Sequence, residues 1–564
     1  MPGPDYVKLY YMAADPAEAD RRQGKILQGV ECRDAGPFLD GPVHRRLAVV
    51  DLDPETGALR PGAQLQLPGR GRVMARYAIA DPTNPDSAGF RPVSVFSTVW
   101  QAIRMFEEPD VLGRKLSWAF DGEQLLIVPE AGTMANAFYH RGSRSLQFFS
   151  FPIDGPGGVT RRAHTCLSPD IVAHEATHAI LDGIAPDLYD ASSPQSLALH
   201  EAIADLSAVV FAVRTRLLCQ TVLDRTRGDL RKSEAFSGIA QELGGAGADD
   251  NAGHPLRNLK NDFTFVAGGP PPASRGPHDL SVVLSGAMYA LFLHAYAQAQ
   301  AKATARPDWN FETDDASHTA SGSSVWLAAE ILKRVAFRAL DYLPPGEISF
   351  ADYARAAMAA DRASNPDNAW VRDFLAAEFV RRGIVASPAE LDPVPHAVKL
   401  KKGLDLDLLV RSDWAAYQFA EKNRRALMIP DGIAFEVRPR LDATKTTFRG
   451  ESGHGQTREV LVKVAWQIHE LADPGLAGVT EIAVTRGTTL VIDRATGKAA
   501  VMLSTAGTHP SQGPGAAAMS AERAGFVAAC VAAGILRPEQ IQLQDGRLRL
   551  RGMGQMLHMA GGGL

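Results

Sequence analysis

The sequence has little of what marks a disulfide-rich or nucleic-acid-binding protein. Only four cysteines occur among 564 residues, and none forms a CxxC pair. We therefore expect neither a disulfide framework nor a cysteine-based zinc site. The net charge is −5, and the densest basic run is the short segment Lys399-Leu400-Lys401-Lys402. That run is typical of a solvated linker, so nucleic acid is not an expected partner.

A secretory start and a long apolar run are also missing. Met1-Pro2-Gly3-Pro4 opens the chain without a basic stretch followed by apolar residues. No segment approaches the roughly 20 apolar residues that span a bilayer. We therefore expect no membrane partner and, by default, a cytoplasmic location, with non-classical secretion left open. The sequence does not indicate the oligomeric state.

Length and pattern predict an α+β protein of more than one domain. Residues 1–165 are predicted as a β-rich lobe, residues 166–387 as a mainly helical lobe, and residues 388–564 as an accessory α+β domain of unknown role. The β-rich lobe is expected to contain strands near 6–10, 46–52, 124–128 and 146–151 and a helix over 95–106. The helical lobe is expected to contain helices at 169–183, 197–218, 280–302, 322–342, 349–362 and 367–382. The accessory domain is expected to contain strands at 459–464, 489–493 and 499–503 and a helix near 520–534.

One segment of the helical lobe carries a metal-binding pattern. His174-Glu175-Ala176-Thr177-His178 places two histidines at i and i+4, on one face of a helix. Two imidazoles one turn apart can hold a zinc ion, and Glu175 lies close enough to act as general base towards a water that the metal activates. The alternative is a helix with two exposed histidines and a solvated glutamate.

The next expected helix supplies the rest of a metal site. A catalytic zinc takes three protein ligands and keeps one position open, and Glu201 is the best candidate for the third ligand. Asp205 lies one turn beyond Glu201, on the same face, where it can accept the second N–H of a ligand histidine. The alternative is an acidic helix surface.

With these two helices, the sequence resembles the thermolysin family of gluzincin metallopeptidases. HExxH on one helix and Glu-x-x-x-Asp on the next is the signature of that group. Further matches extend the resemblance over about residues 90–385. They are Asn136-Ala137-Phe138-Tyr139, Tyr189, Pro255-Leu256-Arg257-Asn258 and Gly276-Pro277-His278-Asp279 before Ser285-Gly286. The resemblance implies a two-lobed catalytic unit with one catalytic zinc.

The resemblance also implies roles for residues outside the ligand set. Asn136 and the Ala137 carbonyl would hold an extended peptide by strand addition. Tyr189 and His278 would stabilise the oxyanion that forms as the peptide carbonyl is attacked. Arg257 would bind a substrate carbonyl. An apolar side chain after the cut would be preferred, and Ile171 would line the pocket that receives it.

Two departures from the family pattern are visible. His200 stands where the family usually has asparagine, beside the glutamate ligand, and is expected to hydrogen-bond a ligand histidine or to rearrange its surroundings. The family's calcium site uses an acidic residue in a stretch that reads Val209-Val210-Phe211-Ala212-Val213 here. Asp170 could supply one carboxylate but has no clear partners, so calcium stays open.

The sequence therefore predicts a zinc-dependent endopeptidase that acts on peptides or proteins. Two alternatives stay open. One is a zinc exopeptidase on small peptides, although no charged group that captures a substrate terminus is evident. The other is a binding protein on a peptidase scaffold that has lost its activity.

Overall fold

A computed structural model gives the three-dimensional structure of the chain. It describes residues 5–14, 16, 27–34, 36–69, 74–154, 160–232, 236, 238–239, 257–305, 320–393, 398, 400, 403–449, 453–471, 478–505, 512–536, 540–545 and 547–554. These residues form a mixed α+β structure, as predicted. Of the loop expected at 244–279, residues 244–256 lie outside the described residues.

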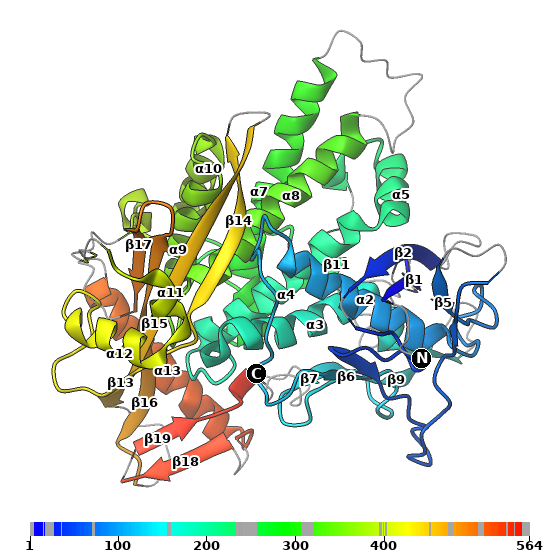
Figure 1. Cartoon of the computed structure of the whole chain (residues 1–564), viewed down its shortest axis with the longest axis horizontal. Coiled ribbons are helices and arrows are strands. Elements are labelled where there is room, and N and C mark those ends of the chain that lie inside the picture. The colour runs from blue at the N-terminus through cyan, green and yellow to red at the C-terminus, as the bar shows by residue number, and fades with distance from the viewer. Residues whose placement is uncertain are drawn as a thin grey trace.

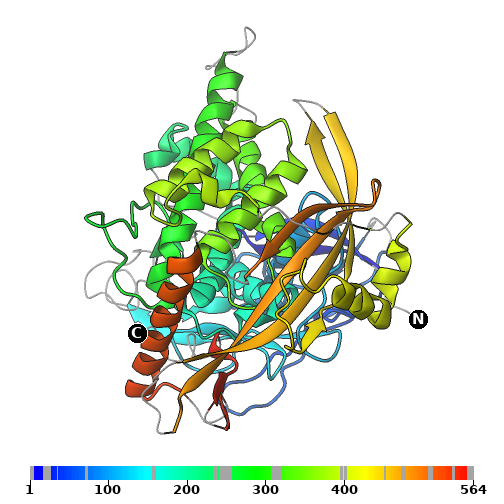
Figure 2. The same cartoon turned by 90° about the vertical axis from the view of Figure 1, so that its left-hand side faces the viewer.

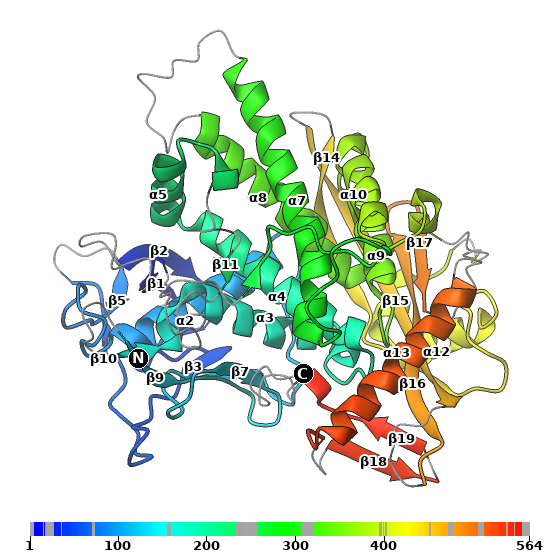
Figure 3. The same ribbon diagram turned by 180° about the vertical axis from the view of Figure 1, so that it is seen from behind.

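Two small sheets enclose one helix in the N-terminal region. The first sheet has the order β2-β1-β5-β4 and the second β3-β6-β8-β7. Helix α2 (Phe90–Glu107) lies between them (Figures 1 and 3). The strands are β1 (Tyr6–Met12), β2 (Leu27–Arg33), β3 (Leu47–Val49), β4 (Leu65–Gln66), β5 (Ala75–Tyr77), β6 (Leu125–Val128), β7 (Ala137–His140) and β8 (Ser145–Phe148). Strand β7 is an edge of the second sheet.

Two strand predictions in this region were too long. The strand expected at 46–52 is limited to β3, and the strand expected at 146–151 divides into β8 and β9 (Ser150–Asp154). Strand β9 leaves the sheet of β8 and pairs with β10 (Thr160–His164) as a separate ribbon. The apolar run that crosses Phe149 contains no signal for this change of partner.

The central region is a bundle of helices that includes the helix of the HExxH segment and the helix that carries Glu201. The helices are α3 (Pro169–Ile184), α4 (Pro194–Arg214), α5 (Arg216–Thr226), α7 (Pro277–Thr304), α8 (Ala320–Tyr342), α9 (Phe350–Ser364) and α10 (Ala369–Arg381). Short elements join them: η2 (Thr165–Leu167), η3 (Pro186–Leu188), η4 (Leu230–Lys232), β11 (Gly238–Ile239), β12 (Arg257–Asn258) and η5 (Pro388–Leu391).

The prediction of a single helix at 197–218 was wrong. The chain adopts an extended conformation at Thr215, which ends α4 and begins α5. The hydroxyl of Thr215 donates to the carbonyl of Phe211 at 3.2 Å. Threonines at 177 and 221 make the same bond within unbroken helices, so the bond alone does not account for the break.

Helices α4 and α7 are long and apolar enough to cross a membrane by length and composition alone. However, 94% of the most apolar window of α4 and 78% of that of α7 is buried inside the protein. Their apolar surface is therefore accounted for by packing against neighbouring helices.

The C-terminal region is built on one sheet of seven strands. Its central order is β13-β15-β16-β19-β18, with β14 paired to β15 and β17 to β16 (Figure 2). Its elements are α11 (Leu406–Arg411), α12 (Asp413–Lys422), β13 (Phe435–Val437), β14 (Leu441–Arg449), β15 (Gly453–Leu471), β16 (Glu481–Asp493), β17 (Lys498–Ser504), α13 (Gln512–Ala532), β18 (Ile541–Gln544) and β19 (Arg547–Leu550). The predicted hairpin is β16–β17, with Gly497 at φ 64° in its turn.

The two faces of this sheet pack against different partners. Leu461 of β15 and Val491 of β16 belong to the same core as the central helices, whereas Val460 and Val462 pack with α11 and α12. This alternation follows from the period of two along a strand. The domain boundary predicted near residue 388 thus lies between two parts that share a hydrophobic core.

Buried ion pairs also cross that boundary. The Asp341 carboxylate accepts from Lys445 Nζ at 2.8 Å, and both side chains are fully buried. Arg338 of α8 contacts Glu459 of β15 at 3.2 Å. Removing one partner of such a pair leaves an uncompensated buried charge. The C-terminal region is therefore tied to the helical bundle by charge as well as by apolar contact.

Candidate metal centre

Helix α3 presents the two histidines of the HExxH segment on one face. Pro169 at the first position and Asp170 in the first turn favour a helix start after Ser168. The imidazole rings of His174 and His178 lie 4.7 Å apart between centroids, and their Nε2 atoms are 3.0 Å apart. Both histidines and Glu175 are buried. The alternative of two exposed histidines and a solvated glutamate does not describe this helix.

Helix α4 brings Glu201 to the same point. Its carboxylate oxygens lie 3.4 Å from His174 Nε2 and 3.6 Å from His178 Nε2. The helix starts at Pro194, after the Ser193 hydroxyl caps it by accepting from the Ser196 N–H. Two imidazole nitrogens and one carboxylate therefore converge, which is the donor set of many catalytic zinc sites.

The carboxylates around His174 favour positive charge on or beside its imidazole. Burial alone lowers the pKa of His174, but its contacts with Asp205 and Glu201 outweigh burial and raise it to about 10. Glu201 is only 1% exposed. A divalent cation that binds both imidazoles and the carboxylate supplies this charge in place of a proton. The residues present fit zinc.

Asp205 and Arg257 support His174 from outside the ligand set. Asp205 Oδ1 lies 3.0 Å from His174 Nδ1, as expected for the group that orients this ring. Arg257 of β12 donates to the Asp205 carboxylate through Nε at 2.9 Å and Nη2 at 2.8 Å. Burial raises the pKa of Asp205, but Arg257 and His174 outweigh it, and the pKa lies below its ordinary value. Asp205 thus stays an anion.

His200 lies against the other ligand histidine. Its Nδ1 is 2.6 Å from His178 Nδ1, and the two rings stack at 4.8 Å with 18° between their planes. One of these nitrogens donates and the other accepts. His200 is therefore positioned to orient His178 as Asp205 is positioned to orient His174.

Glu175 lies beside the edge strand β7. Its Oε2 accepts the Tyr139 N–H at 3.2 Å. Ala137 begins β7 and is buried, while Asn136 directly before it is half-buried, with its side-chain oxygen accepting the Ala137 N–H at 2.8 Å. The structure thus brings the edge strand next to the expected general base. Ile171, one turn before His174, is also buried.

His278 and Tyr189 flank the ligands in different environments. His278, in the first turn of α7, has its Nε2 3.6 Å from Glu201 Oε2 and a side chain that is 29% exposed. Tyr189 is only 2% exposed, and its hydroxyl is shielded from solvent. Burial, followed by the neighbouring Asp182, raises the pKa of Tyr189 above its ordinary value.

The sequence analysis did not predict the network of Asp182, Arg141 and Asp190 beside Tyr189. Asp182, fully buried, accepts from the Tyr139 hydroxyl at 2.8 Å and from Arg141 Nε at 2.8 Å. The Arg141 guanidinium lies 4.3 Å from the centre of the Tyr189 ring and contacts Asp190 at 2.9 Å. The signal for Asp182 was available, because it stands four residues after His178 on the same helix face.

Residues from the last described part of the chain also reach this site. Gly552 donates its N–H to Asp190 Oδ1 at 2.7 Å, and Gly554 donates its N–H to the Tyr189 carbonyl at 2.9 Å. A cavity of only about 10 Å³ separates Gly554 from the metal-binding side chains. It is lined by Tyr139, His178, Tyr189, Leu197, His200, Glu201 and Gly554. The segment from Gly552 to Gly554 thus covers Tyr189 and closes this side of the site.

A second convergence of carboxylates lies far along the chain from the first. Glu108, Asp110 and Glu330 come together, and the ammonium of Lys333 contacts all three, at 3.1 Å from Asp110 and 2.6 Å from Glu330. Asp170, the candidate calcium ligand, belongs to neither cluster among the described residues.

The sequence matches no known protein-family profile and no curated protein.

Proposed function

We propose that the protein is a zinc-dependent endopeptidase with a thermolysin-like catalytic unit. In this proposal the β-rich N-terminal part and the helices from α3 onward form the two lobes. The observation that carries the proposal is the convergence of His174, His178 and Glu201 from two helices, with the Glu175 carboxylate beside them. The three ligands, the general base and both orienting groups are present together.

The chain's own residues supply the proton transfers of peptide hydrolysis. Zinc bound by the two histidines and Glu201 would polarise the peptide carbonyl and activate the attacking water. Glu175 takes a proton from that water as its oxygen bonds to the carbonyl carbon. The same carboxylate then gives the proton to the amide nitrogen as the C–N bond breaks. The Tyr139 N–H holds Glu175 in place for both steps.

The negative charge on the carbonyl oxygen needs a donor beside the metal. His278 is the more accessible of the two candidates, since its side chain is 29% exposed while the Tyr189 hydroxyl is shielded. Removing one such donor typically costs about 3–4 kcal/mol of activation free energy. We assign this role first to His278, and to Tyr189 only when the segment at Gly554 withdraws.

In this proposal, the edge strand β7 and the half-buried Arg257 bind the substrate. An extended peptide would add to β7 through the backbone at Asn136 and Ala137. Arg257 is already fixed by two hydrogen bonds to Asp205, so it can bind a substrate carbonyl without first being ordered. Ile171 would contact the apolar side chain that follows the cut.

Metal analysis combined with one substitution tests the proposal. Purified protein should hold one zinc per chain and cleave an internally quenched peptide with both ends blocked. Glu175→Gln should keep the zinc and lose at least about a thousandfold in kcat, because the general base is gone. Cleavage of free-ended peptides only would favour the exopeptidase alternative. Absence of zinc, or activity unchanged in Glu175→Gln, would favour the inactive binding protein.

A further inference from the structure

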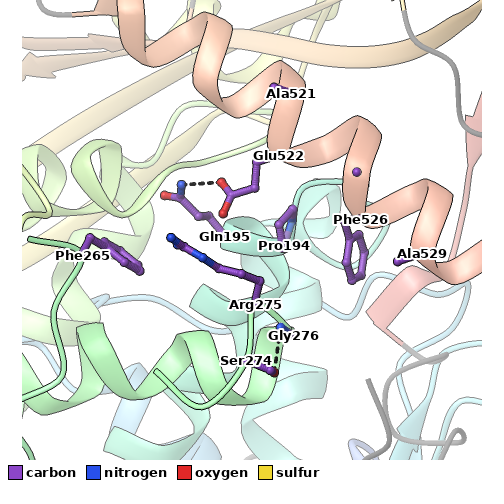
Figure 4. A pocket seen from close by; sticks show the side chains of 11 residues that line it. Pro194, Gln195, Phe265, Ser274, Arg275, Gly276, Ala521, Glu522, Phe526 and Ala529 are labelled. Carbon is purple, nitrogen blue, oxygen red and sulfur yellow. Dashed lines mark hydrogen bonds between the residues drawn. The ribbon is translucent and has the colours of Figure 1, made fainter. Parts of the chain in front are cut away.

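A larger cavity lies beside the metal centre, between the helical bundle and the C-terminal region. It measures about 660 Å³, within the range of ligand-binding pockets. Figure 4 shows its walls: the first turn of α4, the loop before α7, and one face of α13. Its lining includes the side chains of Pro194, Gln195, Phe265, Arg275, Glu522 and Phe526.

The cavity carries opposite charges that do not neutralise each other. Arg275 is exposed, and its guanidinium lies 5.4 Å from the centre of the Phe265 ring. No carboxylate oxygen in the described chain lies within ion-pair distance of Arg275. Glu522 accepts a hydrogen bond from Gln195 Nε2 at 2.8 Å and likewise forms no ion pair with a described residue. Both side chains point towards Gln195 (Figure 4).

The two charges differ in how firmly they are held. Gln195 is fixed at both ends of its amide, because its Oε1 also accepts the Phe350 N–H at 3.1 Å. It therefore anchors Glu522. Among the described residues, Arg275 contacts the face of the Phe265 ring, and its forked donors suit a planar carboxylate. A ligand that carries a carboxylate would be drawn to Arg275 and repelled from the side of Glu522.

Two of the three walls of the cavity come from elements that also carry residues of the candidate metal centre. Gln195 and Glu201 belong to the same helix, and Gly276 directly precedes the first turn of α7, which holds His278. The third wall, α13, comes from the C-terminal region. The cavity and the candidate metal centre therefore share α4 and the start of α7.

We infer that the cavity is a peptide-binding subsite that takes an acidic residue next to an apolar one, with the carboxylate on Arg275 and the apolar side chain against Phe265 and Phe526. The inference rests on the proposed function, which it extends to a substrate class. It also gives the C-terminal region a role, because α13 supplies Phe526 and the repelling charge of Glu522.

Matched peptides test the subsite. A set of end-blocked, internally quenched peptides carries Asp-Phe at successive positions, and a control set carries Asn-Phe. In one register the wild type should prefer Asp-Phe by about fivefold in kcat/KM, the scale of one exposed but well-oriented charge pair. Arg275→Glu should abolish or reverse that preference, measured as the ratio of kcat/KM for Asp-Phe to kcat/KM for Asn-Phe. Glu522→Gln removes the repelling charge from the opposite wall and should keep or increase the preference. Equal cleavage of both sets in every register would overturn the inference.

A binding measurement separates failure of the subsite from failure of the proposed function. Zinc-loaded Glu175→Gln is titrated with the same peptides carrying a fluorophore, and anisotropy is followed. Preferential binding of Asp-Phe that is lost in the Glu175→Gln, Arg275→Glu double variant supports the subsite even if the wild type cleaves nothing. Cleavage without any charge preference in binding overturns the subsite and leaves the peptidase proposal standing.

Discussion

The cluster of His174, His178 and Glu201 and the cluster of Glu108, Asp110 and Glu330 differ in how their charges are balanced. In the candidate metal centre, the Nε2 atoms of His174 and His178 and the Glu201 carboxylate lie within 3.6 Å of one another, and contacts with Asp205 and Glu201 raise the pKa of His174 against the effect of burial. In the second cluster, Glu108, Asp110 and Glu330 also converge, but the Lys333 ammonium already lies among them. In the proposed function a cation from outside would occupy the first cluster, whereas the Lys333 side chain already supplies one to the second.

This difference teaches that convergence of donors alone does not define a metal site. What distinguishes the metal centre is the support behind each ligand: Asp205 behind His174 and His200 behind His178. Such support fixes ring orientation and tautomer. The carboxylates of the second cluster are instead paired with side-chain cations, since Arg214 also contacts Glu108 at 2.7 Å.

The largest effect is expected from removing a ligand in the first cluster. His178→Ala should lose bound zinc and reduce activity by at least about a thousandfold, because two donors hold zinc far more weakly than three. Glu330→Gln is the matched change in the second cluster and should keep both zinc and activity. Metal content and peptide cleavage, measured on the two variants side by side, check this. Zinc retained in His178→Ala would mean that the metal is held elsewhere.

Removing the built-in cation should mainly cost stability. Lys333 is 1% exposed, and Lys333→Met would leave three neighbouring carboxylates without it. We expect a loss of about 3 kcal/mol in the free energy of unfolding, by the general cost of breaking a buried ion pair. Denaturant unfolding at neutral pH measures it, with Lys302→Met on the exposed end of α7 as control. Equal stability of both variants would show that Arg214 alone balances the cluster.

Lys463 is a buried cation of a third kind, because no described carboxylate lies within ion-pair distance of it. Burial lowers the pKa of Lys463 to about 8 from 10.5. The unfolded chain keeps this proton up to about pH 10.5, so the free energy of unfolding should rise between pH 8 and 10.5. Lys463→Met lacks this rise. Its advantage over the wild type should be about 3 kcal/mol below pH 8 and should shrink towards pH 10.5. Parallel unfolding curves across that range would contradict the assignment.

The smallest effect concerns the support behind a ligand. Asp205→Asn keeps the shape of the side chain but removes the charge that faces His174 and Arg257. We expect zinc affinity to fall by about tenfold, with folding retained. Competition with a chelator of known affinity measures it. Asp190→Asn, which alters a charge near Tyr189 and away from His174, is the control and should leave affinity unchanged.

The sequence was most informative where chemistry depends on spacing within one helix. His174, His178, Glu201 and Asp205 were found because the helical period places them one turn apart, and the structure brings all four together. The interpretation of His200 as a partner of a ligand histidine followed from its position next to Glu201. For the same reason Asp182, four residues after His178, could have been found.

Contacts between distant segments could not be predicted in this way. The break at Thr215 has no local signal in the sequence, since threonines at 177 and 221 make the same hydroxyl bond to the carbonyl four residues earlier within unbroken helices. The hydrogen bond between Gly552 and Asp190 joins residues 362 positions apart, without any local pattern. The shared core of Leu461 and Val491 with the helices is likewise a property of the folded chain and not of either strand.

The contacts of Gly552 and Gly554 have a consequence for the order in which the protein is made. Helices α3 and α4 leave the ribosome early, but the segment that covers Tyr189 is added more than 300 residues later. At about 5–20 residues per second, the nascent chain carries His174, His178 and Glu201 for roughly 20–70 s before this wall of the site can form. During synthesis, the metal centre is therefore open on the side that the finished protein keeps closed.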